Sequence, residues 1–147
     1  PYPRLLRKYF DYNIEDRPMN KEALRWLTQA SDDLGTAQIL FDSQRYGPCA
    51  FFCEQAAEKG LKAVLYLAGE RPWGHSVSSL LEQVCVVLKI DPAGAPLAEA
   101  EALDEHYIRP RYPDARTDVE AGYDQETAHD ALGDAQSVLA FVRKGVA

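Results

Sequence analysis

The chain has 147 residues, of which 46% are hydrophobic, and this is enough for the core of one domain and argues against a disordered chain. Its formal net charge of -7 argues against charge-driven binding to DNA or to an anionic membrane, although a small basic pocket is compatible with it. No apolar run reaches the ~18 residues of a membrane span, and no signal peptide is visible. The three cysteines lack zinc-site spacing. We therefore expect a cytoplasmic protein without a metal or a cofactor.

The first 18 residues differ in composition from the rest of the chain and are expected to form an N-terminal arm. They mix basic residues with aromatic ones (Arg4, Arg7, Lys8 and Arg17 with Tyr2, Tyr9, Phe10 and Tyr12). Such a mixture can bind single-stranded nucleic acid by stacking and phosphate contact. Acidic residues interrupt the basic run, so we favour an arm that packs on the domain or on a second subunit. The helical domain then spans residues 19–147.

Residues 20–44 are predicted to form the first long helix, with Asn20 as its N-cap. Apolar residues recur at alternating steps of four and three, which is typical of a seam between antiparallel helices. These residues are Ala23, Leu27, Ala30, Leu34, Ala37 and Phe41. A short link over residues 45–48 then turns the chain back, so the next helix is expected to lie antiparallel to the first.

Residues 47–69 are predicted to form the central helix of the domain. Pro48 suits the first turn and Gly69 suits the C-terminal end. Apolar residues recur on a broad face at helical spacing. Gln55, Glu58 and Lys62 share a narrower polar face, and Glu58 is spaced to pair with Lys62. A helix of this kind is expected at the centre of a bundle.

Three more helices are predicted from the rest of the chain. The third begins at His75 or Ser76 and ends near residues 91–94, the fourth covers about 95–108, and the last covers 124–144. The fold class is therefore all-α, an up-and-down antiparallel bundle of four to five helices.

Two loops concentrate side chains that are suited to ligand binding. Residues 70–76 present Trp73 and His75, and the irregular stretch 109–123 carries Arg109, Arg111 and Arg116. Arg111 beside Tyr112 supplies a guanidinium and a ring, which suit a phosphate and a base. The alternative is that these arginines pair with the acidic helices on either side.

Four segments in order resemble the HEPN domain family. They are ALRWLTQASDDLGTAQIL, YGPCAFFCEQAAEKGLKAVL, WGHSVSSLLEQ and LDEHYIRPRYPDA. The likeness covers residues 20–144. It is to the small prokaryotic branch often encoded beside a minimal nucleotidyltransferase, and the C-terminal domain of sacsin is similar. The resemblance implies a four- or five-helix bundle that forms a homodimer.

The resemblance implies two activities. Many family members resemble metal-independent ribonuclease toxins of toxin–antitoxin pairs, with an Arg followed by a His after four to six residues. Here Arg71 and His75 have only three residues between them, and no other Arg and His have that spacing. We therefore expect a protein that is not an enzyme and has no catalytic residues. The alternative is a ribonuclease whose active site is assembled across the dimer from Arg111, His106 or His129.

The other branch resembles nucleotide-binding modules or partners of a nucleotidyltransferase. The site residues that it implies here are Lys62, His75, Arg111 and Tyr112, with Arg109 adding charge. Arg111 is expected to bind a phosphate, Lys62 to act as a second charge and His75 to donate to phosphate or ribose. Tyr112 would stack on the base. A third possibility is that the domain only dimerises.

Overall fold

The computed structural model describes residues 18–115 and 122–144, and the side chains of residues 21–115 and 122–143 within them. It contains five α-helices, and no strand occurs in these ranges. They are α2 (Pro18–Asp42), α3 (Tyr46–Leu67), α4 (Val77–Leu88), α5 (Leu97–Asp104) and α6 (Gln125–Lys144). Short 3-10 turns follow α4 at Pro92–Gly94 and α5 at Pro113–Ala115. The prediction of an all-α antiparallel bundle is confirmed.

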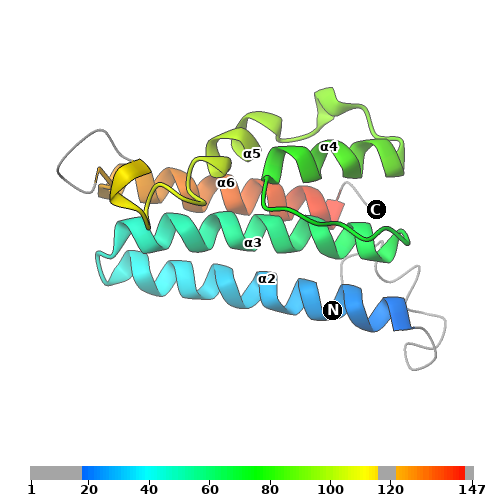
Figure 1. Cartoon of the computed structure of the whole chain (residues 1–147), viewed down its shortest axis with the longest axis horizontal. Coiled ribbons are helices and arrows are strands. Elements are labelled where there is room, and N and C mark those ends of the chain that lie inside the picture. Colours follow the sequence, from blue (N-terminus) through cyan, green and yellow to red (C-terminus); the bar gives the residue numbers. More distant parts are fainter. Residues whose placement is uncertain (1–17, 116–121, 145–147) are drawn as a thin grey trace.

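Helix α3 lies at the centre of the bundle, between α2 on one side and α4, α5 and α6 on the other (Figure 1). Most of its residues are buried, including Cys49, Cys53, Leu61 and Leu65. The prediction from its broad apolar face is therefore confirmed. Because α3 contacts every other α-helix, side chains that it carries between two neighbours are held on several sides.

Small residues let the helices approach closely on both sides of α3. Ala23, Ala30 and Ala37 of α2 are no more than 1% exposed, as the alternating small and large pattern predicted. On the other side, a Cβ placed on Gly60 would lie 2.5 Å from Cδ2 of Leu139 in α6. Only a residue without a side chain therefore fits at position 60 with the present packing.

Two helix boundaries differ from the sequence prediction. Helix α2 begins at Pro18, so Asn20 lies inside it and is not the N-cap. Helix α5 ends at Asp104 and not near residue 108, and hydrogen-bonded turns replace it up to Arg111. The backbone bonds after Asp104 step by three residues, as from His106 N to Leu103 O, and the Asp104 side chain accepts hydrogen bonds from the N-terminus of α4. The predicted end of α3 is correct, since Gly69 follows it with a φ of 91°.

The predicted N-terminal arm, apart from Pro18, and Arg116 of the long loop lie outside the described residues. Among the helices that the structure does describe, none combines the length and the apolarity that crossing a membrane requires.

Candidate functional site

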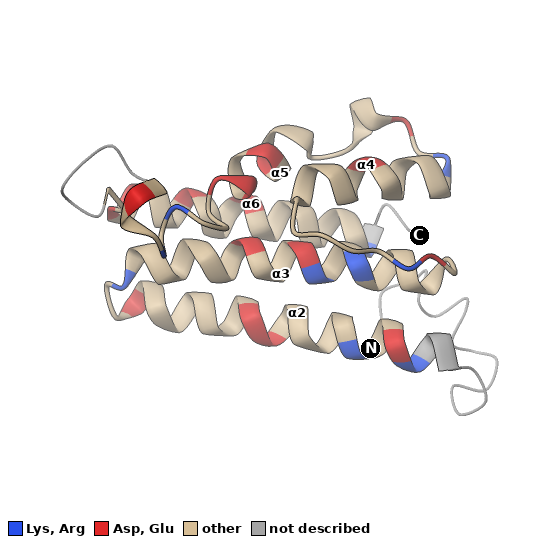
Figure 2. Cartoon of the chain, in the orientation of Figure 1, with Lys and Arg blue, Asp and Glu red and all other residues tan. Residues whose placement is uncertain are grey.

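A buried carboxylate, Glu58 of α3, is the centre of the polar cluster. Its side chain is 3% exposed, and its Oε1 atom accepts hydrogen bonds from Lys62 Nζ and from His75 Nδ1, both at 2.8 Å. Its Oε2 atom accepts from Gln55 Nε2 at 2.9 Å. Figure 2 shows acidic and basic residues following one another along α3. A buried carboxylate with three donors is well compensated, which explains why a charge is tolerated at this depth.

The bond to Glu58 fixes the orientation of the His75 ring. A carboxylate can only accept, so Nδ1 carries the proton and Nε2 is left for another partner. The His75 side chain is 53% exposed, unlike Glu58 below it. The ring is also stacked on Tyr107, with 4.4 Å between the centroids and 17° between the planes.

The loop that carries His75 is fixed by α5. The Asp104 carboxylate accepts hydrogen bonds from the backbone N–H groups of Val77 and Ser78 and from the hydroxyls of Ser76 and Ser78. Ser76 is the N-cap of α4, so His75 is not its cap. Because several donors hold this carboxylate, the position of His75 depends on the contact between α4 and α5.

Arg111 lies on the same face, in a cage of aromatic rings. Its guanidinium carbon is 4.3 Å from the ring centroid of Phe51, 4.8 Å from that of Tyr107 and 5.2 Å from that of Tyr112. Its Nε and Nη2 atoms donate to the backbone oxygen of Tyr107. Tyr107 therefore contacts both Arg111 and His75, and no acceptor for Arg111 Nη1 occurs among the described residues.

Of the five predicted site residues, four are brought together and one is not. Lys62, His75, Arg111 and Tyr112 are linked through Glu58 and Tyr107. Arg109 instead lies 6.0 Å from the ring centroid of Tyr123, with Glu105 as a distant ion partner at 3.9 Å.

Lys62 is less accessible than the sequence analysis expected. Its side chain is 8% exposed, and its ammonium lies 5.2 Å from the ring centroid of Trp26. The Trp26 ring is itself stacked on Tyr66. Lys62 therefore places a fixed positive charge beneath the surface, where it compensates Glu58 and reaches solvent only at its edge.

His106 and His129, named for the ribonuclease alternative, lie elsewhere. His106 is 7% exposed, and its Nδ1 atom is 2.8 Å from the Tyr123 hydroxyl. Burial lowers the pKa of His106, which favours its neutral form. His129 of α6 packs near Phe41 of α2, with 6.2 Å between the centroids. The histidine that lies near Arg111 is His75.

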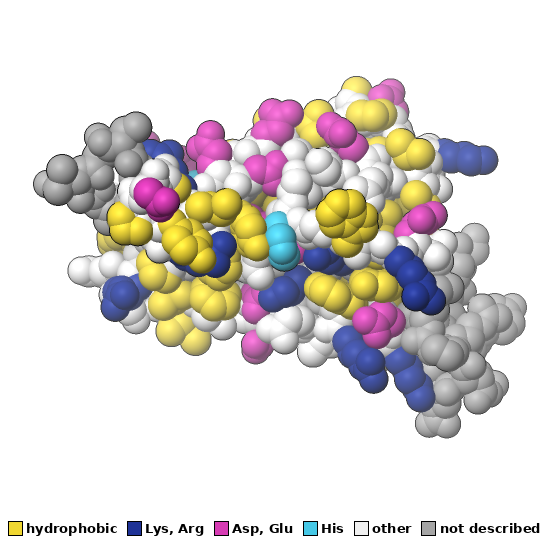
Figure 3. Space-filling view, viewed as in Figure 1, with side chains coloured by type: hydrophobic (Ala, Val, Ile, Leu, Met, Phe, Trp, Pro, Cys, Tyr) yellow, Lys and Arg dark blue, Asp and Glu magenta, His cyan; other side chains and the backbone are white. Residues whose placement is uncertain are grey.

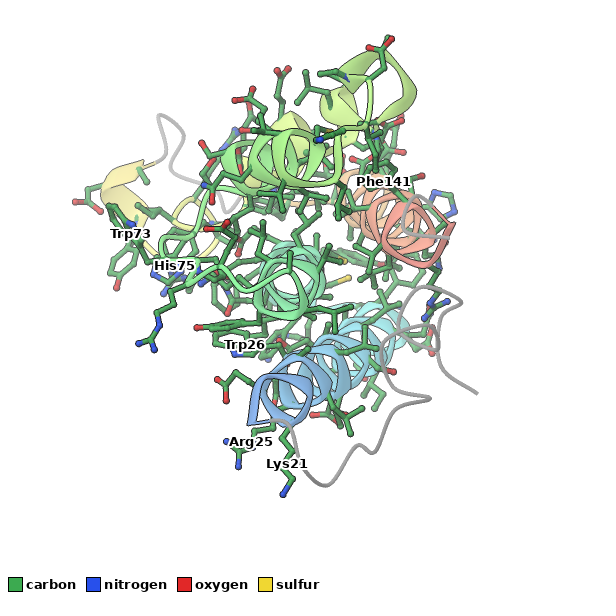
Figure 4. The ribbon with its side chains drawn as sticks, turned by 90° about the vertical axis from the view of Figure 1, so that its right-hand side faces the viewer. Lys21, Arg25, Trp26, Trp73, His75 and Phe141 are labelled. Carbon is green, nitrogen blue, oxygen red and sulfur yellow. The ribbon has the colours of Figure 1, made fainter. Side chains whose placement is uncertain are left out.

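The exposed part of this cluster lies beside Glu58 of α3, and we call it the α3 face. It is made by Trp73 and His75 from the loop after α3 and by Tyr107, Arg111 and Tyr112 from the turns after α5. Figure 3 shows a histidine side chain on this side of the molecule, with apolar side chains to its left and right and cationic ones beside it. Trp73 is 88% and Tyr112 is 50% exposed. Figure 4 shows Trp73 and His75 on the same side of the bundle as Trp26, whereas Phe141 lies on the opposite side.

Glu54 is the member of the cluster that the sequence analysis missed. It is fully buried, Gln55 Nε2 donates to its Oε2 at 2.8 Å, and its Oε1 atom has no hydrogen-bond partner among the described residues. Burial raises the pKa of this carboxyl to about 8. A signal was present in the sequence, because Glu54 interrupts the apolar face formed by Ala50, Ala57 and Leu61 at helical spacing.

A large groove lies away from the α3 face. It has a volume of about 920 Å³ and runs between α2 and α6, where Leu27, Ile39, Leu139 and Val142 line it. Its lining is mainly apolar and includes none of the predicted site residues. Within the part of the chain that is described, no group of three or more His, Cys, Asp or Glu side chains is placed to hold a metal ion.

Comparison with known proteins places this geometry in a family. The chain matches the HEPN domain over residues 23–145. It is 30% identical over 141 residues to the protein named "Putative toxin MJ1304" of Methanocaldococcus jannaschii, covering 88% of this chain and 92% of that protein.

Two crystal structures have the same fold. TT1696 from Thermus thermophilus aligns with a TM-score of 0.70 and 35% identity, over 82% of this chain and 95% of that one. ST0689, described as an archaeal HEPN homologue, aligns with a TM-score of 0.70 and 29% identity, over 86% of this chain and 98% of that one. The family match spans most of the chain, and the chain therefore belongs to the HEPN domain family.

Proposed function

We propose that this HEPN domain is a non-catalytic module that binds a nucleotide on its α3 face and acts as a homodimer or with a protein partner. The observation that carries the proposal is that Lys62, His75 and Arg111, distant in sequence, are linked on one face through Glu58 and Tyr107. A phosphate favours cationic donors, and a base favours exposed rings.

Each residue has a role in this proposal. Arg111 binds the phosphate through its Nη1 donors while the aromatic cage holds its plane in place. His75 presents its Nε2 atom to the ligand, because Nδ1 is held by Glu58. Lys62 contributes charge from below. Tyr112 or Trp73 stacks on the base, and Arg109 adds only long-range charge.

The test is a thermal-shift screen with nucleoside mono-, di- and triphosphates on the wild type and on Arg111→Ala. A ligand at about 100 times its dissociation constant adds roughly 2.7 kcal/mol, which is a shift of about 5–10 °C for a chain of this length. Arg143→Ala is the matched control, since Arg143 is exposed and lines the groove between α2 and α6.

We expect a shift with the wild type and with the Arg143 variant, and a smaller one or none with the Arg111 variant. If no nucleotide stabilises the wild type, the proposal loses its ligand. If the Arg111 variant is stabilised as much as the wild type, the nucleotide binds elsewhere.

A second candidate is a metal-independent ribonuclease toxin, and a specific observation favours it. Glu58 holds His75 in the tautomer that leaves Nε2 as an acceptor, which is the arrangement of an oriented general base. Arg111 lies beyond the Tyr107 ring and could stabilise a phosphate during cleavage. The relative named a toxin in Methanocaldococcus jannaschii points the same way.

An RNA cleavage assay separates the two candidates. The ribonuclease predicts cleavage without added metal that is lost in His75→Ala and retained in His129→Ala, because His129 lies near Phe41. Absence of cleavage by the wild type refutes the ribonuclease, and cleavage lost only in His75→Ala refutes a non-catalytic module.

A further inference from the structure

The side chain of Glu54 lies where burial disfavours an ionised carboxylate. It lies on the apolar face of α3 with no exposed surface. Gln55 donates to Oε2, which leaves Oε1 to carry a proton. Oε1 is fully buried and has no hydrogen-bond partner in the described part of the chain. Such a carboxyl is stable in its neutral form and costly to ionise, because nothing offsets the charge on that oxygen.

The Gln55 amide couples Glu54 to the α3 face. Its Nε2 atom donates to Glu54 Oε2 at 2.8 Å and to Glu58 Oε2 at 2.9 Å. Glu58 in turn holds His75 and Lys62. The nitrogen and not the amide oxygen must occupy this position, since the oxygen would repel the Glu58 carboxylate. A change of charge on Glu54 is therefore felt two hydrogen bonds away by Glu58, the group that orients the exposed histidine.

Charged groups from three elements surround Glu54. Burial is the main cause that raises its pKa, and Glu58 on α3 and Asp104 at the end of α5 raise it further. The Gln55 hydrogen bond and the charge of Arg111, from the turn after α5, lower it. With Glu54 neutral, the two cations Lys62 and Arg111 balance the two carboxylates Glu58 and Asp104. Ionised Glu54 gives the cluster a net negative charge, which disfavours an anionic ligand.

We infer that Glu54 regulates the proposed nucleotide site through its proton: the α3 face accepts an anionic ligand while Glu54 is neutral and releases it when Glu54 ionises. This inference rests on the proposed function. The neutral state prevails at neutral pH, and alkaline conditions favour release.

The binding experiment uses adenosine diphosphate without added metal, at pH 7 and pH 9.5, and calorimetric titration of the full chain. We expect the affinity of the wild type to fall about tenfold at the higher pH, as a unit charge about 10 Å away produces at an effective dielectric constant near 20. In Glu54→Gln, which is always neutral, the affinity should change much less. Asp134→Asn is the matched control, because burial also raises the pKa of Asp134 on α6, outside this network.

A second readout needs no ligand. The side-chain amide resonances of Gln55 in the wild type should show a titration step near pH 8, because the amide contacts both carboxyls. A step near pH 8 that persists in Asp134→Asn and vanishes in Glu54→Gln supports the inference.

Three results would overturn the inference about Glu54, and they can be told apart. If the amide resonances show no step between pH 6 and pH 10, Glu54 is not a proton switch. If adenosine diphosphate binding falls equally in the wild type and in Glu54→Gln, another group controls release. If the ligand binds at neither pH, the proposed function fails for this ligand and the regulation fails with it, even where the amide step is present.

Discussion

Replacing Glu54 by Gln should change how the stability of the protein depends on pH. A carboxyl with a pKa near 8 in the folded state and 4.5 otherwise binds more protons when folded than when unfolded. The free energy of unfolding that it contributes is therefore complete below pH 4.5 and is lost as the pH rises toward 8. Gln has nearly the same shape and remains neutral, so the variant should not lose that stability.

The size of the effect follows from the same pKa values. Each pH unit between them corresponds to about 1.4 kcal/mol, so the difference between variant and wild type should grow by about 3 kcal/mol from pH 5.5 to pH 8. The buried His106 and Asp134 also titrate differently in the folded state, but both proteins contain them. Their contributions cancel in the difference.

The assay is urea unfolding of both proteins, followed by circular dichroism at half-unit steps from pH 5.5 to pH 9. This range stays above the isoelectric point of about 4.9. The variant should gain stability relative to the wild type as the pH rises, with similar slopes in urea. A difference that is constant across the range would refute the reasoning, and so would one that shrinks as the pH rises.

Other substitutions test the packing that supports the α3 face. Gly60→Ala should destabilise the protein by about 1 kcal/mol, because its Cβ would collide with Leu139, and this exceeds the gain in helix propensity. Gly133→Ala on α6 should instead stabilise the protein by about 0.5–1 kcal/mol, because a Cβ added there would have no neighbouring atom within 4 Å. If the two substitutions changed the thermal stability equally, the packing around Gly60 would be contradicted. Asp104→Ala should cost about 2 kcal/mol in urea unfolding, since Ser78 and its neighbours lose their acceptor, and unchanged stability would show that the α4 N-terminus has another partner.

The helices of the domain could be predicted from the sequence because their signals are local. Apolar spacing placed α3 and its broad buried face, and Gly69 marked its end. The contacts at the helix ends could not be predicted in this way. Asp104 at the end of α5 bonds to the N-terminus of α4, and no local signal reports such a contact.

The candidate site was predicted in its residue types but not in its connections. Sequence spacing pairs Glu58 with Lys62, since both lie on one helix one turn apart. It cannot pair Glu58 with His75, which follows after a loop, or bring Arg111 under the ring of Tyr107. Those contacts depend on how the loops after α3 and α5 lie across the bundle.

The sequence by itself determined the fold class, the family and the polar face of α3, because periodicity and motif order are properties of the chain alone. Only the tertiary structure decided that Glu54 is fully buried with one oxygen unpartnered among the described residues and that Arg109 lies beside Tyr123 and not with Arg111. The physical reason is that burial and charge compensation depend on which side chains surround a group in space, and residues far apart in the sequence supply them.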